Sequence, residues 1–476
     1  MFSSNKSDAL LSRIRDGKPL SGTEKLNLIV GLSIPSMLAQ VTSVLMFFID
    51  ASMVGSLGAE ASASIGLVES ATWLFGSITV AASMGFSVQV AHFIGAKDFV
   101  KARQVFRHAL VCSALLSLVV AFFGALIHRP LPYWLGGGAD IARDASLYFL
   151  VYALSMPMLQ LENLSSAMLK CSGNMRIPSV VSVLMCVLDV IFNFILIFPT
   201  RTIHVFGHSF LMPGANLGVV GAALGTSLAI IVSSLILAWF AIFKNKMLAL
   251  HLDREPFKWV WSYVRNAAKI GSPMALQSML MSGAQVVSTI IVAPLGNFAI
   301  AANTFAITAE SLCYMPGYGI GDAATTLVGQ STGAGRYDIC RSFARLTVYL
   351  GMAVMAVMGV VMYVFAPEMI GVLTPVEGIR ELGVQSLRIE AFAEPFFAAA
   401  IVGYSVFVGA GDTLKPALMN LGSMWLVRLT LAAALAPGYG LKGVWIAMAA
   451  ELTFRGSIFL YRLFRGNWLR PHMVNG

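Results

Sequence analysis

Charged residues are scarce in this chain. Asp, Glu, Lys and Arg make up 12% of the 476 residues, whereas ordinary soluble domains carry about 25%. Apolar residues make up 57%. Twelve membrane spans of about 20 residues would use about 240 residues, and the apolar content is sufficient for that number with connecting loops. The composition therefore excludes a soluble enzyme and indicates a polytopic membrane protein of the all-α class.

Cysteine is also sparse, with five residues and no CxxC spacing. Five scattered cysteines support neither a disulfide framework nor a zinc site. Sequence signatures of catalysis and of ATP binding are missing as well, since the chain has no HExxH, GxSxG or GxxxxGK[ST] sequence. An integral membrane enzyme and an ATP-driven pump are therefore disfavoured, and no cofactor is expected. A channel is disfavoured because no pore motif is repeated.

Apolar runs bounded by polar residues predict twelve spans in two sets of six. The first set lies near residues 26–52, 62–86, 104–127, 145–168, 178–198 and 216–243, and the second near 265–292, 299–322, 342–366, 383–408, 416–436 and 441–465. The expected organisation is an N-terminal segment 1–25, a first lobe 26–243, a linker 244–264, a second lobe 265–466 and a C-terminal segment 467–476.

The two lobes repeat one sequence pattern. A single shift of the chain, without a gap, superposes prolines and glycines that chance would rarely align, namely Pro35 on Pro273, Gly58 on Gly296, Gly95 on Gly333, Gly173 on Gly411 and Pro178 on Pro416. We call this the repeat shift. The frame fails only after residue 198, where the first half has a longer loop containing His204, His208 and Pro213. Each copy has an even number of spans, so the repeats enter the membrane from the same side and are parallel.

Basic residues collect on one side of the predicted topology. The side that holds both termini and the linker receives 24 Lys and Arg, and the opposite side receives 6. By the positive-inside rule, both termini should be cytoplasmic. The net charge of +9 therefore follows from membrane orientation and needs no nucleic-acid partner.

Three segments resemble the MATE family, the multidrug and toxic compound extrusion transporters. They are PSMLAQVTSVLMFFIDASMVGSLG (Pro35 to Gly58), MPGYGIGDAATTLVGQSTGAGR (Met315 to Arg336) and FVGAGDTLKP (Phe407 to Pro416). The resemblance implies a V-shaped exporter of two six-helix lobes in a bacterial inner membrane. Such a protein is expected to act as a monomer among membrane lipids and to expel organic, often cationic, molecules in exchange for H⁺ or Na⁺.

A lipid-linked saccharide flippase of the same superfamily is the alternative function. Its anionic pyrophosphate cargo would call for several arginines in the cavity. Apart from basic residues near span ends, which are counted with the two membrane sides, only Arg428 and Arg455 lie within predicted spans. The excess of acids there favours export of cations instead. The acids are Asp50, Glu69, Glu162, Asp189, Glu310, Glu390, Glu394 and Glu451.

Acidic residues within spans are functional candidates, because an Asp at a helix centre costs about 2.5 to 3.5 kcal/mol on insertion scales. Asp50 lies several turns after Pro35 on the first predicted span; the residues alone are equally consistent with an interfacial helix end and with a buried ion-binding acid. The resemblance favours the second, because the archaeal and DNA-damage-inducible branches of the family carry their essential acid at this place. Pro35 is then expected to act as a hinge, since proline removes a helix hydrogen bond; the alternative is a static kink.

Asp189 and Asn193 lie one turn apart on the fifth predicted span, and no basic partner lies in the first lobe's spans. The family places an Asn before an Asp here, so the order is reversed in this chain. Thr226 corresponds to a family hydroxyl near these acids, and either Tyr148 or Tyr152 is expected to close the cluster. Carboxylate, amide and hydroxyl oxygens suit Na⁺, and paired acids can share a proton, so the coupling ion stays open.

In the second lobe, Glu310, Glu394 and Arg428 are candidates for lining the cavity, as is Glu69 in the first. For Glu69 and Glu310, the residues are equally consistent with a hydrogen-bonded or interfacial acid. Arg428 is expected to pair with an acid of the second lobe, such as Glu310 or Glu394. Glu451 and Arg455, spaced i to i+4, are expected to pair only with each other. The second-repeat equivalents of Asp50 and Asp189 are Ser288 and Val427, so we place the coupling site in the first lobe.

Overall fold

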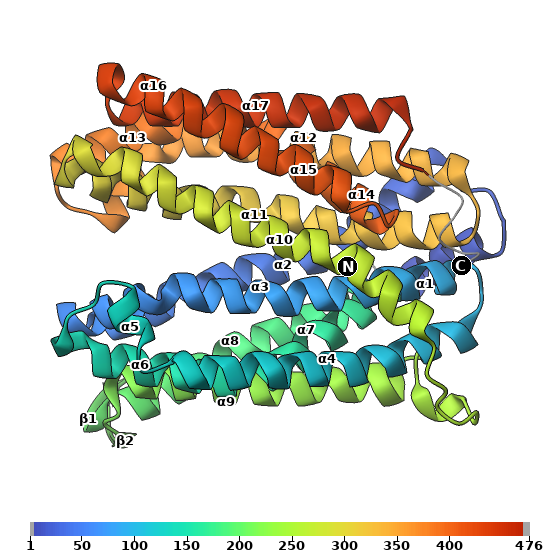
Figure 1. The fold of residues 1–476 in the computed structure, drawn as a ribbon, viewed down its shortest axis with the longest axis horizontal. Helices are drawn as coiled ribbons and strands as arrows, with labels where there is room; N and C mark the ends of the chain where they lie inside the picture. The colour runs from blue at the N-terminus through green and yellow to red at the C-terminus, as the bar shows by residue number, and fades with distance from the viewer. Residues whose placement is uncertain (1–3, 470–476) are drawn as a thin grey trace.

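The computed structural model describes residues 4–469. Its helices form two lobes that lie side by side (Figure 1). The first lobe contains α2 (Gly22–Gly55), α3 (Ala59–Gly95), α4 (Phe99–Ile127), α5 (Leu131–Trp134), α6 (Ala139–Leu154), α7 (Met156–Cys171), α8 (Arg176–Ile197) and α9 (Gly218–Trp239). The second contains α10 (Trp261–Val292), α11 (Asn297–Gly333), α12 (Tyr337–Leu373), α13 (Glu377–Ala391), α14 (Glu394–Gly409), α15 (Leu414–Gly422), a π-helical turn Ser423–Arg428, α16 (Leu429–Tyr439) and α17 (Leu441–Arg465).

A short helix, α1 (Ser4–Arg15), precedes the lobes and packs against α2 and α11. It lies at the same end of the bundle as the last residues of α17, and we call this the terminal end (right in Figure 1). The opposite end carries the strands β1 (Pro199–Val205) and β2 (His208–Ala215), and we call it the hairpin end. Of the predicted C-terminal segment 467–476, residues 470–476 lie outside the described part of the chain.

Nine helices within residues 4–469 are long and apolar enough to cross a membrane, or ten if the bent pair α13 and α14 is one span. The two other predicted spans correspond to the pair α6 and α7, each of 16 residues, and to α11. The half of α11 that follows Pro316 is rich in glycine and threonine. The protein is therefore a multi-pass membrane protein with the predicted two-lobe helical architecture.

The duplication is visible in the backbone. The repeat shift places both bounds of α3 on those of α11 and both bounds of α7 on those of α14. Three turns with positive φ recur at equivalent positions: Gly58 (119°) and Gly296 (105°), Gly173 (95°) and Gly411 (87°), and Lys97 (61°) and Gly335 (70°). The repeat that the prolines and glycines predict is thus a repeat of helix ends and turns.

Two of the predicted spans are broken in the middle. α6 ends at Leu154 and α7 begins at Met156, while α13 ends at Ala391 and α14 begins at Glu394 with a bend of 61°. Pro157 and Pro395 lie in the first turn of α7 and α14, where proline costs no helix hydrogen bond. The sequence interpretation, which placed continuous spans at 145–168 and 383–408, missed both breaks.

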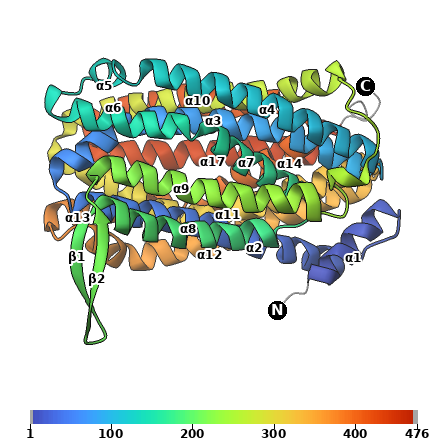
Figure 2. The same ribbon diagram turned by 90° about the horizontal axis from the view of Figure 1, so that it is seen from below.

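The long loop of the first lobe is an antiparallel hairpin. Thr202 pairs with Leu211 and Val205 with His208, and Phe206 at the tip is 99% exposed. Figure 2 shows the hairpin projecting from the helical body. It accounts for the failure of the repeat frame after residue 198.

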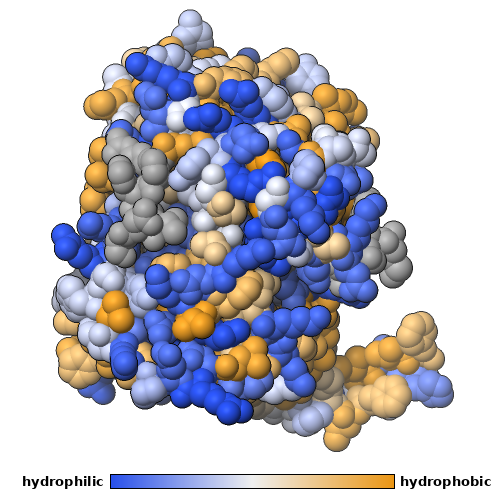
Figure 3. Space-filling model, turned by 90° about the vertical axis from the view of Figure 1, so that its right-hand side faces the viewer, coloured by the Kyte–Doolittle hydropathy of each residue, from blue (hydrophilic) through white to orange (hydrophobic). Residues whose placement is uncertain are grey.

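The lobes meet closely at the terminal end, where α3 crosses α11. A Cβ atom on Gly95 would overlap the carbonyl oxygen of Gln330, and one on Gly333 would overlap the carbonyl oxygen of His92. Glycine is therefore required at both positions for this approach. His92 also joins the lobes, because its Nε2 lies 2.8 Å from the carbonyl oxygen of Gly409. Figure 3 looks onto the terminal end, and hydrophilic residues cover much of it.

Candidate functional site

The structure brings together Asp50 from α2 and Asp189 and Asn193 from α8. The side-chain amide of Asn193 donates to Asp50 Oδ1 at 2.8 Å and to Asp189 Oδ2 at 3.2 Å. Asp189 and Asn193 are fully buried, and Asp50 is partly buried. One amide group therefore holds two carboxylates close together inside the first lobe.

Free oxygen atoms remain in this cluster. Asp189 Oδ1 and Asn193 Oδ1 are buried and have no hydrogen-bond partner among the described residues. α9 covers them closely, because a Cβ atom on Gly225 would overlap Asn193 Oδ1. Buried oxygens without donors are costly unless a proton or a cation reaches them. Thr226 follows Gly225 on α9, but within residues 4–469 no hydrogen bond joins it to either acid.

The two tyrosines of α6 have different surroundings. Tyr152 donates its hydroxyl hydrogen bond to the carbonyl oxygen of Thr72 at 2.9 Å. Tyr148 packs in a cluster with Val54 and Ile197, which lie one turn beyond Asp50 and Asn193 on their helices. Tyr148 therefore closes the hairpin side of the acid cluster, whereas Tyr152 fixes α6 to α3.

Glu69 does not join this cluster. Its side chain is exposed near the hairpin end of α3, and Trp73 Nε1 donates to Glu69 Oε1 at 3.4 Å. Trp73 in turn contacts Phe47 of α2, with 5.2 Å between ring centroids.

Pro35 lies inside the continuous helix α2, beside a polar contact between the lobes. Ser36, the next residue, donates to Asp322 Oδ2 of α11 at 2.6 Å, and Gln40 donates to the same oxygen at 3.4 Å. Lys170 at the end of α7 forms an ion pair with this oxygen at 2.9 Å. The segment of α2 that follows Pro35 is thus fastened to the second lobe.

In the second lobe, Arg428 pairs with an acid of the same lobe, as predicted, but this acid is neither Glu310 nor Glu394. Arg428 pairs with Glu451 at 2.6 Å, and Arg455 pairs with the other oxygen of Glu451, also at 2.6 Å. The π-helical turn Ser423–Arg428 faces α17, which brings Arg428 to Glu451 instead of to Glu310 or Glu394. The predicted pair of Glu451 and Arg455 is present, but Glu451 also pairs with Arg428.

Glu310 and Glu394 do lie together, and Glu390 joins them. One carboxylate oxygen from each of the three lies within 4.8 Å of the others, and all three residues are buried. Their helices are α11, α13 and α14, at the break between α13 and α14.

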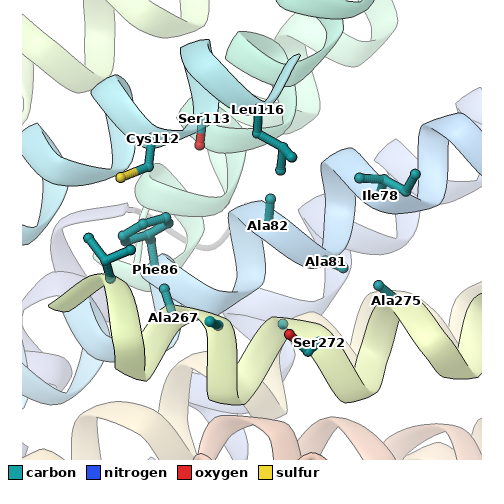
Figure 4. A pocket seen from close by; sticks show the side chains of 13 residues that line it. Ile78, Ala81, Ala82, Phe86, Cys112, Ser113, Leu116, Ala267, Ser272 and Ala275 are labelled. Carbon is teal, nitrogen blue, oxygen red and sulfur yellow. The ribbon is translucent and has the colours of Figure 1, made fainter. Parts of the chain in front are cut away.

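A cavity between the lobes lies away from all of these acids. It is an apolar crevice of about 300 Å³ between α3, α4 and α10 at the seam of the two lobes. Figure 4 shows its small side chains, including Ala81, Ala82 and Ala267, with Phe86 and Cys112 at one side. The crevice offers apolar surface and no ionisable acid.

Sequence reasoning gave Asp322 and Glu390 no site role. Asp322 is the last residue of the eighth predicted span, and the cost of placing an acid next to an apolar segment is the signal that could have marked it. Glu390 was counted among the span acids, but the broken helix that brings it to Glu394 could not be read from the sequence.

Comparison with known proteins identifies the chain's family. The MatE family profile matches residues 35–195 and 273–433. The chain belongs to the MATE family. The bounds of the two matched segments are related by the repeat shift, the same shift that relates the lobes. MATE proteins are membrane transporters, so the family membership agrees with the helical, multi-pass fold.

Bacterial relatives match almost the whole chain. A probable multidrug resistance protein NorM from Thermotoga maritima is 26% identical over 442 residues, covering 92% of each chain. A probable NorM from Pseudomonas aeruginosa is 28% identical over 444 residues, covering 90% of this chain and 87% of its own. An outward-facing structure of a multidrug resistance MATE transporter has a TM-score of 0.85 at 21% identity, covering 94% and 99%. A mutant of VcmN, a MATE transporter of Vibrio cholerae, has a TM-score of 0.83 at 17% identity, covering 97% and 98%. These two structures support the fold.

Proposed function

We propose that this MATE protein is a multidrug exporter of the bacterial inner membrane that expels organic cations in exchange for H⁺ or Na⁺. The observation that carries the proposal is the buried cluster in which Asn193 bridges Asp50 and Asp189. The names of the NorM relatives support the export of drugs. No catalytic role is assigned to any residue.

The cluster suits either coupling ion. Na⁺ prefers oxygen ligands, and the unpartnered Asp189 Oδ1 and Asn193 Oδ1, together with Asp50, provide them. A proton can instead be shared between two carboxylates held close together. Here the ion is a transported substrate of the exchanger.

Ion binding can drive transport only if it favours one conformation over the other. Asp50 belongs to the part of α2 that follows Pro35, while Asp189 and Asn193 belong to α8. Bending at Pro35 would move Asp50 relative to the other two and so change the affinity for the ion. The hydrogen bond from Ser36 to Asp322 would transmit this bending to the contact between the lobes.

We propose that the terminal end is cytoplasmic. The 24 to 6 division of basic residues supports this orientation. The hairpin then lies on the outer side of the membrane.

The charges within the spans favour cationic cargo over the anionic cargo of a lipid-linked saccharide flippase. Both arginines in the spans, Arg428 and Arg455, are paired with Glu451, so neither is free to bind a pyrophosphate. Glu69 remains exposed and could attract a cation. The flippase alternative is therefore the weaker one.

The test is gradient-driven transport by purified protein in proteoliposomes, with H⁺ and Na⁺ gradients imposed separately. Asp50→Asn and Asp189→Asn should fold, because the amide removes a buried charge without changing the shape of the side chain. Both should lose accumulation of a cationic dye against its gradient. Asp140→Asn is the matched control, since Asp140 is an exposed acid at the hairpin end. Full activity in both cluster variants would eliminate the first-lobe coupling site.

A further inference from the structure

The three glutamates of the second lobe form a cluster that the proposed coupling mechanism does not use. Glu310, Glu390 and Glu394 are 5%, 0% and 0% exposed. Each places a carboxylate oxygen within 4.8 Å of the other two. Glu390 is near the end of α13 and Glu394 begins α14, so the break in this span brings both to Glu310 of α11. Broken helices near the middle of the membrane form ion sites in many transporters.

The cluster has no protein partner for its charges. In the part of the chain that the structure describes, all four carboxylate oxygens of Glu390 and Glu394 are buried without a hydrogen-bond partner. The neighbouring arginines, Arg428 and Arg455, are both bound to Glu451. Buried charges are normally paired or bound to metal. The cluster therefore needs a cation that the chain itself does not supply.

The equivalent three positions of the first lobe carry no acid and need no cation. The repeat shift maps Glu310, Glu390 and Glu394 onto Thr72, Tyr152 and Met156. There, the hydroxyl of Tyr152 donates to the carbonyl oxygen of Thr72 at 2.9 Å, which joins α6 to α3. In the first lobe, a neutral phenol and a buried methionine therefore occupy the positions of Glu390 and Glu394. Three acids are not required by the architecture, and their presence in one lobe only points to a ligand.

We propose that Glu310, Glu390 and Glu394 bind a divalent metal ion within the second lobe. When ionised, the three carboxylates carry a charge of −3, and Arg428, Glu451 and Arg455 together carry +1. A divalent cation balances the remaining charge of −2, whereas a single Na⁺ leaves it half balanced. Ligands that are all carboxylate oxygens are those that Ca²⁺, Mg²⁺ and Mn²⁺ prefer. The proposal does not depend on the first-lobe coupling site.

The experiment titrates purified protein with Mn²⁺, because free Mn²⁺ has a strong paramagnetic resonance signal that is lost on binding. The wild type should bind a single Mn²⁺ per chain, and added Ca²⁺ should displace it. Glu390→Gln should abolish saturable binding. A double variant, Glu390→Tyr with Glu394→Met, should abolish it too, and it should fold because it installs the pair that the first lobe already carries. Asp50→Asn should bind Mn²⁺ like the wild type.

Thermal unfolding measured with and without Mn²⁺ separates metal binding from misfolding. Mn²⁺ should raise the melting temperature of the wild type and of Asp50→Asn, and should not change that of the two glutamate variants. Failure of the wild type to bind Mn²⁺ would overturn the proposal and leave protonation to neutralise the acids. Binding that survives in both glutamate variants would overturn it as well. Neither result would affect the transport test of Asp50 and Asp189.

Discussion

Replacing Asp322 should open the terminal end of the protein. Asp322 Oδ2 accepts a hydrogen bond from Ser36 at 2.6 Å and pairs with Lys170 at 2.9 Å, and both partners belong to the first lobe. Asp322→Ala removes both contacts, so it should destabilise the arrangement in which the lobes touch at this end. When the lobes separate, Ser36 and Lys170 form hydrogen bonds with water instead. The net contribution of each contact to stability therefore applies, and not its energy in isolation.

The size of the effect follows from these two contacts. A hydrogen bond to a charged group contributes about 1.5 to 3 kcal/mol. The ion pair, whose side chains are 22% and 29% exposed, adds about 0.2 to 1 kcal/mol. The sum, about 2 to 4 kcal/mol, corresponds to an increase of about 30-fold to 700-fold in the ratio of open to closed forms. Asp322→Asn keeps a neutral acceptor for Ser36, whose hydrogen bond contributes about 0.5 to 1.5 kcal/mol, so its increase should be smaller than that of Asp322→Ala.

The assay measures distances between spin labels at Lys101 of the first lobe and Lys415 of the second, two exposed residues at the terminal end. The five native cysteines are first replaced. Asp322→Ala should add a longer distance to the distribution, and Asp322→Asn should add less of it. Asp338→Ala is the control, because Asp338 is an exposed acid at the same end. A distribution for Asp322→Ala that matches the wild type would refute the assignment of this contact as a closure between the lobes.

Three other outcomes follow from the described contacts. Glu451→Gln should lower the melting temperature strongly, because it leaves the buried Arg455 and the partly buried Arg428 without a counter-charge, at a cost of about 3 to 5 kcal/mol; an unchanged melting curve would contradict the ion-pair cluster. A tag at Lys258 in the linker should be protected from impermeant reagents in intact cells, whereas one at Gly137 should react, and labelling of both would exclude the proposed orientation. Cationic dyes should be exported faster than anionic dyes of similar size, and the reverse preference in a substrate screen would count against the electrostatic interpretation.

Most of the architecture could be predicted because hydropathy and repeated Pro and Gly positions are local signals. The span boundaries and the repeat shift needed no knowledge of packing. The breaks before Met156 and Glu394 could not be predicted, because a proline after a short apolar segment is compatible with either a kink or a new helix. Likewise, the partner of Arg428 depends on a π-helical turn that rotates its side chain toward α17, and no periodicity in the sequence marks that turn.

The candidate site was predictable to the extent that acids in apolar segments are rare. Asp189 and Asn193 stand out by residue type within an apolar span, whereas only the family resemblance favours Asp50 as a buried acid over an interfacial helix end. The structure places Asn193 in hydrogen-bond contact with both acids. Tyr148 and Tyr152 could not be separated, since both lie on the same face of α6, one turn apart, and only the packing against α2, α3 and α8 distinguishes them. The role of Asp322 depends on a contact across the lobes, which single-span reasoning does not consider.

The glycine contact at the crossing of α3 and α11 has a symmetry of its own. Gly95 and Gly333 are the same position of the repeated unit, and so are the residues they touch, His92 and Gln330. Each copy therefore presents to the other the surface that it receives, which is the pattern of an isologous contact in a two-fold dimer. The approximate two-fold axis passes between the two glycines. Within one polypeptide, this contact has the geometry of an interface between two like chains. Because the two glycines approach main-chain oxygen atoms, the contact places no demand on the side chains that differ between the lobes, the paired aspartates of one and the three glutamates of the other.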